Sequence, residues 1–515
     1  MQEQIPPILR PERVTPVSLQ RLADRFGLES DSGDVLMTGI SMNTGDLRQG
    51  DLFVAMPGLK THGARFAGKA AELGAVAVVT DAAGKNMIQA ENPGFGLPIV
   101  ILENPRQRLG DLAAFVYAND TGAQPKRFGT TGTNGKTSTS YLLEAIARQL
   151  GEVTGLTSTA ERHIAGEVIV SRLTTPESPE MQALIARMRE RGVGSIAIEV
   201  SAQALTQLRV DGIFFDVVGF TNLSHDHLDD YSDFDEYLAA KAQLFTKRRA
   251  GKGVICLDSA FGEAFAAKSE IDFVTISSNH SVAADWQVRV THQALDHTAF
   301  ELTSAAGETI STRIPLLGAH MAANAGLAMV MLVQAGFSVE AIQAAVAEGI
   351  DAYLPGRTEL VSPAGAPAVF VDFGHSPDAF QKTLDAVRAV TPGKLIMVFG
   401  ADGDRDASKR PDMSRVAALG SDILVITDHH PRFEDPASIR KTLFDAARAA
   451  RPELELYEVS PPEQAIRKAV SLAKPGDSIY WAGPGHQDYR DIRGVRTPYS
   501  ARAEARAALR EHGYQ

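Results

Sequence analysis

The sequence predicts an α/β protein made of three domains. The chain has 515 residues, too many for one hydrophobic core, and the usual size of a domain suggests about three. Short β-rich runs alternate with helical stretches along the chain, a pattern typical of largely parallel sheets. Turn residues concentrate in "ANDTGAQPKR" (118–127), and a proline-glycine break follows in "AYLPGRTEL" (352–360). We therefore expect domains over residues 1–124, 125–354 and 355–515.

The first two predicted domains each contain short apolar runs that we expect to form strands. In the first domain these runs are 51–58, 75–81 and 97–104. In the second they are 195–201, 216–224 and 253–258, followed by a more β-like stretch over 285–304. Helical spans separate the runs. Both domains are therefore predicted to be α/β, with a mostly parallel sheet in the second.

The third predicted domain repeats this alternation in a Rossmann-like pattern. Its expected strands cover 368–374, 394–401, 422–428 and 478–485. Each strand runs directly into a polar or glycine-bearing motif: "GHSPD", "DGDRD", "HHPR" or "GPGHQ". In an open parallel sheet, ligands bind at the carboxyl ends of the strands. The third domain is therefore predicted to carry a ligand site.

The composition is that of an ordinary globular protein, with 44% hydrophobic and 22% charged residues. The net charge of −12 argues against nonspecific binding to nucleic acid or to an anionic membrane surface. No run approaches the roughly 18 continuous apolar residues of a membrane span, and the polar, proline-rich N-terminus is unlike a signal peptide. We expect a cytoplasmic monomer that neither binds nucleic acid nor inserts into a membrane, with its single cysteine, Cys256, packed in a buried strand.

The stretch "GTTGTNGKTST" (129–139) has the composition of a phosphate-binding loop, although Thr130 stands where the strict P-loop pattern has its first glycine. Backbone N–H groups of such a turn, with the positive end of the following helix, can surround phosphate oxygens. Lys136 would reach the terminal phosphates, and the hydroxyl of Thr137 would bind Mg²⁺. Alternatively, the glycines only allow a tight strand-to-helix turn. The residues of the predicted nucleotide site are Gly132, Thr133, Asn134, Gly135, Lys136, Thr137 and Ser138.

Residues further along bear on what the phosphate is for, because the loop alone leaves open a GTPase switch, a motor ATPase, and a kinase or ligase. Glu199 lies at the end of a predicted strand, where its carboxylate can join Thr137 around Mg²⁺. His227 is either a second metal ligand or an ordinary surface histidine, and Lys241 by itself has the pattern of a routine helical lysine. The helix after the loop is expected to be amphipathic, with an apolar stripe of Leu142, Leu143, Ile146 and Leu150.

Together these motifs resemble those of the Mur ligase family, ATP-dependent enzymes that build the peptide of the bacterial cell wall. The similar stretches lie in order along nearly the whole chain: "TGTNGKTS", "TTPE", "EVSAQAL", "FTNLSHDHLD", "EYLAAKAQLF", "LPGR", "DFGHSPD", "GADGDRDASKRPDM" and "GPGHQDY". "GDLFVAMPG" and "HGARF" near the N-terminus, with "DGDRD" and "HPR" in the third domain, are most similar to one branch of the family. That branch adds the third amino acid to UDP-N-acetylmuramoyl-L-alanyl-D-glutamate (the muramoyl dipeptide).

The resemblance implies a uridine-binding first domain, a central P-loop-type ATPase domain and a third domain that holds the amino acid. Lys136 and Thr137 would bind the phosphates of ATP and Mg²⁺. Glu199 would bind magnesium between the phosphates, and His227 a second magnesium. Lys241 matches a lysine that this family carries as a carbamate, which would make it, too, a metal ligand.

The resemblance also assigns residues to the two larger substrates. Asp372 and His375 match positions of the third domain that close over the nucleotide. The first domain has Asn43 and Thr44 where the family has an Asp-Ser pair, so binding of uracil there is a weaker implication. The residues expected to bind the muramoyl dipeptide are Asn43, Thr44, Thr174, Thr175, Ser201, Gln207 and Arg209.

The implied reaction has a simple chemical logic. A carboxylate resists attack by an amine because its leaving group would be oxide. ATP therefore first phosphorylates the γ-carboxylate of D-glutamate, with Lys136 and Mg²⁺ offsetting the charge that builds on the phosphoryl group. The α-amine of a free amino acid then attacks the acyl phosphate, giving the amide, ADP and phosphate. Three sites must converge, so closure of the domains is expected.

The identity of the amino acid stays open at this point. Members of the family that select meso-diaminopimelate typically have an asparagine and a glutamate where this chain has His430 and Gln487. Arg432, which suits a distal carboxylate, is kept, but Asp402 replaces a glycine. Diaminopimelate and a basic amino acid such as L-lysine or L-ornithine therefore remain alternatives. The residues expected in this pocket are Arg405, His429, His430, Arg432, Gly483 and Gln487.

Other interpretations of these motifs differ in what they require. A folylpolyglutamate synthetase would share the ATP machinery but lack the N-terminal uridine domain. The presence of residues 35–115 therefore argues against this interpretation. A nucleotide-binding regulatory protein would have little need for His227, Lys241 and an arginine-rich third domain together. His429 and His430 alternatively form a turn or a metal pair, and the pair would need a carboxylate cluster nearby.

Overall fold

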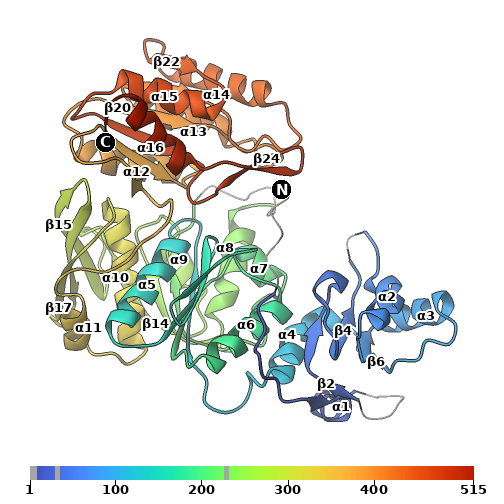
Figure 1. Cartoon of the computed structure of the whole chain (residues 1–515). Helices are drawn as coiled ribbons and strands as arrows, with labels where there is room; N and C mark the ends of the chain where they lie inside the picture. The colour runs from blue at the N-terminus through green and yellow to red at the C-terminus, as the bar shows by residue number, and fades with distance from the viewer. Residues whose placement is uncertain (1–7, 29–34, 59, 225–230, 515) are drawn as a thin grey trace.

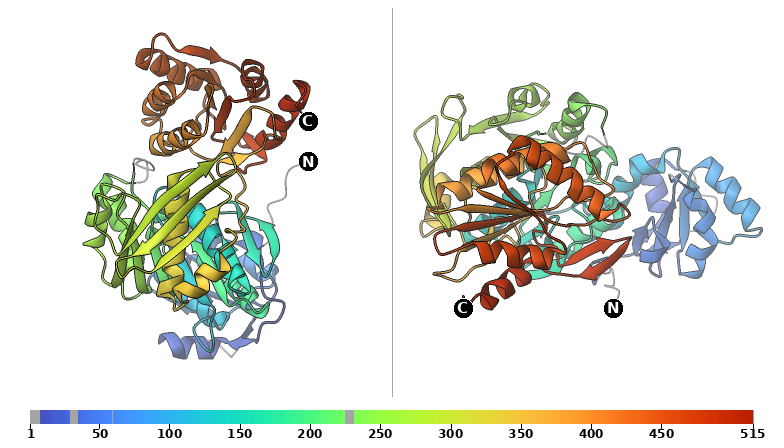
Figure 2. Two further views of the ribbon diagram at one scale, coloured as in Figure 1. Left: turned by 90° about the vertical axis from the view of Figure 1, so that its left-hand side faces the viewer. Right: turned by 90° about the horizontal axis from the view of Figure 1, so that it is seen from above.

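The computed structural model describes residues 8–28, 35–58, 60–224 and 231–514. It confirms an α/β chain built as three units, each around its own sheet. The first unit lies beside the central one, and the third unit lies over the central one (Figures 1 and 2). Among the residues described, no helix combines the length and the apolar composition that crossing a membrane requires.

The first unit is a small parallel sheet with the order β3-β4-β5-β6. Strands β4 and β5 are buried throughout, because helices cover both faces of the sheet. Its elements are β1 (Val17–Ser18), α1 (Leu19–Phe26), β2 (Leu36–Met37), β3 (Gly39–Ser41), η1 (Thr44–Asp46), β4 (Asp51–Ala55), η2 (Gly63–Phe66), α2 (Ala67–Glu72), β5 (Ala77–Thr80), α3 (Ala82–Glu91), β6 (Ile99–Ile101) and α4 (Pro105–Val116).

The central unit has one long sheet with the order β10-β9-β8-β11-β7-β12-β13-β14-β15-β16-β17. Its first half in chain order is β7 (Lys126–Thr131), α5 (Lys136–Gln149), β8 (Thr154–Thr157), β9 (Glu161–Ile164), β10 (Glu167–Val170), α6 (Ser178–Glu190), β11 (Ser195–Glu199), α7 (Ala202–Thr206) and β12 (Phe215–Phe220). The second half is α8 (Phe234–Ala242), η3 (Gln243–Phe245), β13 (Ala250–Cys256), α9 (Gly262–Ala266), β14 (Asp272–Ser277), β15 (Trp286–Ala294), β16 (His297–Ser304), β17 (Thr309–Ile314), α10 (Ala319–Gln334) and α11 (Val339–Ala345).

Most of this sheet is parallel, as predicted, and its two ends are antiparallel. The strands from β8 through β15 in the sheet order pair in parallel. The stretch predicted to be more β-like forms β15 and β16, an antiparallel pair extended by β17. Every second residue of β16 and β17 is buried, because one face of these strands packs on α10 and the other faces solvent.

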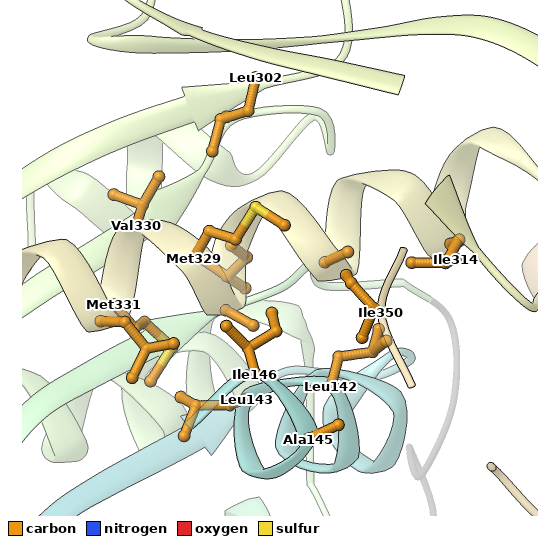
Figure 3. Close-up of a cluster of buried hydrophobic side chains, with 14 of the residues drawn as sticks. Leu142, Leu143, Ala145, Ile146, Leu302, Ile314, Met329, Val330, Met331 and Ile350 are labelled. Atoms are coloured by element: carbon orange, nitrogen blue, oxygen red, sulfur yellow. The ribbon is translucent and has the colours of Figure 1, made fainter. Parts of the chain in front are cut away.

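Helix α5 differs from the amphipathic helix that we predicted. Its apolar stripe packs as expected, with Leu142 and Ile146 pointing toward α10 (Figure 3). The residues from Thr137 to Ala147 are nevertheless all buried. The polar residues of the first turn are covered as well, because α5 packs against both the sheet and the neighbouring helix α10. A periodicity in the sequence does not show how many neighbours a helix has.

The third unit has a six-stranded sheet with the order β18-β19-β23-β20-β21-β22, parallel except for β18. Helices α12, α13 and α14 bury their apolar residues against one face, and α15 and α16 against the other. The elements are β18 (Glu359–Leu360), β19 (Ala368–Asp372), α12 (Pro377–Ala389), β20 (Leu395–Phe399), α13 (Arg410–Gly420), β21 (Ile423–Ile426), α14 (Pro436–Ala450), β22 (Glu455–Glu458), α15 (Pro462–Leu472), β23 (Ser478–Ala482), β24 (Tyr489–Ile492), β25 (Val495–Pro498) and α16 (Ala501–Glu511).

A partly buried ion cluster joins α5 to β9 in the central unit. His163 lies 3.6 Å from Glu144 and 3.4 Å from Glu161, and Tyr141 donates a hydrogen bond to Glu161 at 2.8 Å. Burial alone would lower the pKa of His163, but the two carboxylates outweigh burial and raise this pKa to about 9. The imidazolium therefore stabilises the folded state fully below the ordinary pKa near 6.5, and this contribution is lost as pH rises through 9.

Replacing His163 by glutamine is expected to lower the melting temperature more at pH 6 than at pH 9.5. By linkage, the difference in stability between the two pH values is at most about 3 kcal/mol. Thermal unfolding of wild type and H163Q at both pH values measures it. H297Q serves as the control, because His297 is a half-buried histidine paired with an exposed carboxylate, that of Asp296. A destabilisation of H163Q that does not change with pH would contradict the ionised cluster.

Candidate active site

A cavity of about 840 Å³ lies between the central and third units. Its walls come from the start of α5, the end of β11, the start of α10 and the loops that follow β19, β20, β21 and β23. Among the described residues, none of the first unit lines it. The polar and glycine-bearing motifs that follow the strands of the third unit therefore face the phosphate loop across one cavity.

The phosphate loop connects β7 to α5 and approaches its neighbours closely. A Cβ atom at Gly132 would lie 1.9 Å from the hydroxyl of Thr221, and one at Gly135 would lie 2.6 Å from the amide oxygen of Asn324. Gly135 also has a φ of 86°, which side chains rarely adopt. The glycines are thus required by the space around the loop as well as by its backbone.

The amide groups of this loop are not all open to a ligand. Those of Thr133 and Asn134 donate to the backbone and side-chain oxygens of Asn222, at 2.8 and 3.1 Å. The first turn of α5, in contrast, has no side-chain cap, so its N–H groups and the positive end of the helix face the cavity. This helix start is suited to bind an anion such as phosphate.

Two lysines lie over the same carbonyl group of the loop. The ammonium of Lys136 donates to the backbone oxygens of Gly132 and Thr133 at 3.1 and 2.9 Å. Lys241, on α8, is only 1% exposed; its ammonium donates to the oxygen of Gly132 at 2.9 Å and lies over the ring of Tyr237. The local interpretation of Lys241 as a routine helical lysine is therefore wrong, because the residue is buried beside the phosphate loop.

Glu199 and Thr137 form the oxygen pair expected for a metal site. Glu199, at the end of β11, is 2% exposed and accepts from the hydroxyl of Thr137 at 3.0 Å. It also accepts from the backbone N–H and hydroxyl of Thr159, at 2.8 and 3.0 Å. Carboxylate and hydroxyl oxygens are ligands that Mg²⁺ prefers, so this pair fits the expected ion. His227 lies outside the described residues.

The residues expected to bind the muramoyl dipeptide divide into two groups. Thr174, Ser201 and Arg209 line the cavity. Thr175 is buried beneath them and donates to the backbone oxygen of Glu199 at 2.9 Å, while Gln207 accepts from Arg209 at 2.6 Å. The last two residues hold the wall in place, and Thr175 does so from below the surface of the cavity.

Asn43 and Thr44 are not brought to this cavity. They lie in the first unit, where the side chain of Asn43 caps η1 by accepting from the N–H of Gly45 at 2.9 Å. A ligand that reached both places would have to extend from the cavity to the first unit.

The third unit contributes a rigid strand end and a direct contact to the phosphate loop. Asp372, at the end of β19, accepts from the N–H groups of Thr358 and Gly374 and from the hydroxyl of Tyr480. His375 follows and lines the cavity. The side chain of Asn134 also donates to Asp378 on α12 at 3.1 Å. The two units therefore already touch at the phosphate-loop end of the cavity, which Asp372 also lines although most of its side chain is buried.

Of the residues expected to hold the amino acid, Arg405, His429, Arg432, Gly483 and Gln487 line the cavity, but His430 does not. His430 is buried, and its Nδ1 accepts from the N–H of Asp491 at 2.9 Å, so its Nε2 carries the proton and donates to Gln487 at 2.7 Å. Burial, helped by the nearby His429, lowers the pKa of His430 to about 4.

The alternative of a metal pair at His429 and His430 fails for the same reason. The carboxylate that such a site would need is present, since Asp402 lies within ligand spacing of both histidines. Both ring nitrogens of His430 are engaged in hydrogen bonds, however, and no lone pair is left for a metal. His430 instead holds Gln487 in position.

Comparison with known proteins agrees with this arrangement. Three family descriptions match the chain: "Mur ligase family, catalytic domain" over 36–117, "Mur ligase middle domain" over 130–332 and "Mur ligase, glutamate ligase domain" over 356–485. The UDP-N-acetylmuramyl-tripeptide synthetase of Leifsonia xyli subsp. xyli is 52% identical over 513 residues, which cover 99% of each chain. The chain belongs to the Mur ligase family.

Two further similarities extend along the whole chain. The UDP-N-acetylmuramoyl-L-alanyl-D-glutamate–2,6-diaminopimelate ligase of Streptomyces coelicolor is 40% identical over 509 residues, covering 98% of each chain. A solved structure of a ligase with that name superposes with a TM-score of 0.68 and 26% identity, covering 97% of this chain and 100% of the other. The similarity of this Mur ligase to its relatives therefore includes the first unit.

Sequence reasoning missed several residues of this Mur ligase site. Arg357 is buried, lies over the ring of Phe373 and donates to the hydroxyl of Thr137 at 3.2 Å, which links the third unit to the phosphate loop. Its motif "LPGR" contributed to the resemblance, but no role was assigned to it. His320 and Asn324 of α10 also line the cavity. They lie in a largely apolar helix, where no local pattern distinguishes them.

Replacing Gly135 by alanine is expected to weaken binding of ATP by at least about tenfold, because the loop must move away from Asn324. G151A is the matched control: Gly151 has a similar φ of 89°, but no atom lies within 4 Å of the position of its Cβ. Calorimetric titration with a non-hydrolysable ATP analogue compares the two variants. Equal affinities of G135A and G151A for the ATP analogue would contradict the view that Gly135 is needed to avoid a clash with Asn324.

Proposed function

We propose that this Mur ligase is a MurE-type enzyme, which uses ATP to join a third amino acid to UDP-N-acetylmuramoyl-L-alanyl-D-glutamate. The observation that carries the proposal is the single cavity in which the phosphate loop and Glu199 face the strand ends of the third unit. The names and full-length coverage of the relatives support the same step in the synthesis of the peptidoglycan precursor. The reaction would take place in the cytoplasm, where ATP is available.

The geometry suggests a role for each wall of the cavity. The uncapped start of α5 and the ammonium of Lys136 would hold the phosphates of ATP, with Arg357 reaching toward them from the third unit. Bound at Thr137 and Glu199, Mg²⁺ would offset the charge on the transferring phosphoryl group. Arg209 and Thr174, on the same side as Glu199, would hold the dipeptide with its γ-carboxylate toward the phosphate.

The second half of the reaction would use the third unit. Arg405 is exposed on the cavity wall and has no hydrogen bond or ion pair to any residue that the structure describes, so it is available for the carboxylate of the incoming amino acid. The α-amine would then attack the acyl phosphate and release phosphate. Contact of Asn134 with Asp378 and of Arg357 with Thr137 would help to exclude water from the acyl phosphate.

A carbamate on Lys241 fits the surroundings of this residue. The nitrogen of a carbamylated lysine keeps one N–H, which could continue to donate to the oxygen of Gly132. The modification would replace a buried cation by a group with two oxygens beside the phosphate loop, a suitable ligand type for a second Mg²⁺. We therefore keep Lys241 as a metal ligand in its modified form.

The rival functions leave parts of the chain without a role. A folylpolyglutamate synthetase would not need the first unit, yet residues 36–117 match a Mur ligase domain. A regulatory nucleotide-binding protein would not need a cavity with an unpaired arginine opposite the phosphate loop. Both rivals predict that turnover of ATP does not depend on the muramoyl dipeptide.

The proposed function predicts that phosphate is released only when ATP, the muramoyl dipeptide and an amino acid are all present. Each omission should reduce the rate to background, because the acyl phosphate needs both an acceptor carboxylate and an attacking amine. A phosphate-release assay, with the tripeptide product identified by mass spectrometry, makes this measurement. ATP hydrolysis indifferent to both substrates would sink the ligase assignment.

Replacing Lys241 by alanine is expected to reduce kcat by at least about a hundredfold, because the site loses the group that would hold the second cation. Small carboxylates such as acetate or formate should restore part of the activity by occupying the position of the carbamate. K252A is the control, since Lys252 donates to the backbone oxygen of Gln334 away from the cavity. An unaltered kcat in K241A, or a loss that no carboxylate restores, would remove the carbamate assignment.

A further inference from the structure

Asp402 forms an ion cluster on the amino-acid side of the cavity. One of its carboxylate oxygens lies 2.7 Å from Nδ1 of His429, and the other lies 3.5 Å from the guanidinium of Arg432. Burial alone would raise the pKa of Asp402, but His429, and more weakly Arg432, lower it well below its usual range. Asp402 remains 28% exposed and lines the cavity, so an ionised carboxylate faces the space where the substrate binds.

Arg432 is held in place by the protein on both its backbone and its side chain. Its backbone has a φ of 50° and is fixed between the oxygen of Asp491 and the N–H of Arg493. Its guanidinium donates to the backbone oxygen of Gly403 at 2.8 Å and faces Asp402 with another nitrogen. The charge of Arg432 is thus already balanced within the protein, and the side chain has little freedom to turn toward a ligand.

His429 offers a second polar atom to the same space. Its Nδ1 is engaged with Asp402, while its Nε2 is buried and has no hydrogen-bond partner among the residues described. Gln487 lies nearby on the cavity wall, with its amide oxygen oriented by His430. Among the described residues of this part of the wall (Asp402, His429, Arg432 and Gln487), Asp402 therefore supplies the negative charge.

We propose that Asp402 makes this pocket select an amino acid whose side chain ends in an amine and carries no second carboxylate, the class of L-lysine, L-ornithine and L-2,4-diaminobutyrate. The proposal rests on the proposed function, and names the class of its amino-acid substrate. Arg405, which has no partner among the described residues, takes the single α-carboxylate, and the side-chain ammonium lies against Asp402. Within the described part of the chain, the unpaired guanidinium of Arg405 and the partly exposed carboxylate of Asp402 match the two opposite charges of such a substrate.

A distal carboxylate, as in meso-diaminopimelate, meets the opposite situation. To bind Arg432 it must share the guanidinium with Asp402, which places a second negative charge beside that partly buried carboxylate. Asp402 thus acts against the dicarboxylic substrate as well as in favour of the diamino one. An amino acid with a neutral side chain of the same length as lysine would be neither attracted nor repelled by the charge of Asp402.

The first test is a panel of amino acids with the wild-type enzyme, ATP and the muramoyl dipeptide. We expect L-lysine, L-ornithine or L-2,4-diaminobutyrate to give a kcat/KM at least about tenfold above both meso-diaminopimelate and L-norleucine, the analogue of lysine without its amine. Comparable or better use of meso-diaminopimelate, or equal use of norleucine, would overturn the inference and leave the ligase function intact. No turnover with any amino acid would instead count against the proposed function itself.

The second test replaces Asp402 by asparagine, which keeps an acceptor for His429 and removes the charge. D402N should lower kcat/KM for the best diamino acid and raise it for meso-diaminopimelate, so that their ratio falls at least about tenfold while KM for the muramoyl dipeptide stays unchanged. The matched control is D412N, which removes an exposed carboxylate of α13 paired with Arg415. An unchanged ratio in D402N would refute the role of Asp402. A parallel loss with every amino acid and a changed KM for the dipeptide would do the same, because it indicates a structural role.

Discussion

The active site depends on the parallel pairing of β7 with β11. This pairing places Glu199 opposite Thr130, directly before the phosphate loop, so the loop and the carboxylate leave the same edge of the sheet. The hydrogen bond from Thr137 to Glu199 follows from that register. A slip of one residue would turn the side chain of Glu199 to the other face of the sheet, since side chains alternate along a strand. Burial of β11 along its whole length makes such a slip costly.

Parallel pairing of strands also positions the residues that the third unit contributes from the opposite side of the cavity. Its parallel strands β19, β20, β21 and β23 end at one edge, and that edge faces the edge of the central sheet that carries the phosphate loop. Arg357 and Asn134 cross between the units, each with a hydrogen bond to a residue of the other. The carboxyl ends of the strands in the two sheets thus face each other across one cavity. The residues of its walls lie on loops whose positions are determined by those strands.

The sequence was informative where a local pattern corresponds to local structure. The buried strands, the glycine-bearing turn from strand to helix and the position of Glu199 follow from apolar runs, glycine spacing and the end of a strand, and the structure confirms these local features. Lys241 shows the limit: nothing on its own helix indicates that it lies over Gly132, and only the resemblance placed it there. His430 was expected in the pocket, but its contacts to Asp491 and Gln487 join residues that no motif connects.

Asp402 shows why the residue types of a pocket motif do not by themselves give specificity. Arg432 suggested a distal carboxylate because arginine pairs well with carboxylates, but its partner in this chain is an aspartate 30 positions earlier. The backbone of Arg432 and its bond to Gly403 hold the guanidinium in place whatever the substrate is. With that framework fixed, an aspartate at position 402 supplies within the protein the carboxylate that a dicarboxylic amino acid would otherwise bring. The role of an arginine in such a pocket therefore depends on whether the protein itself already supplies a carboxylate partner. That partner is visible only in the folded chain.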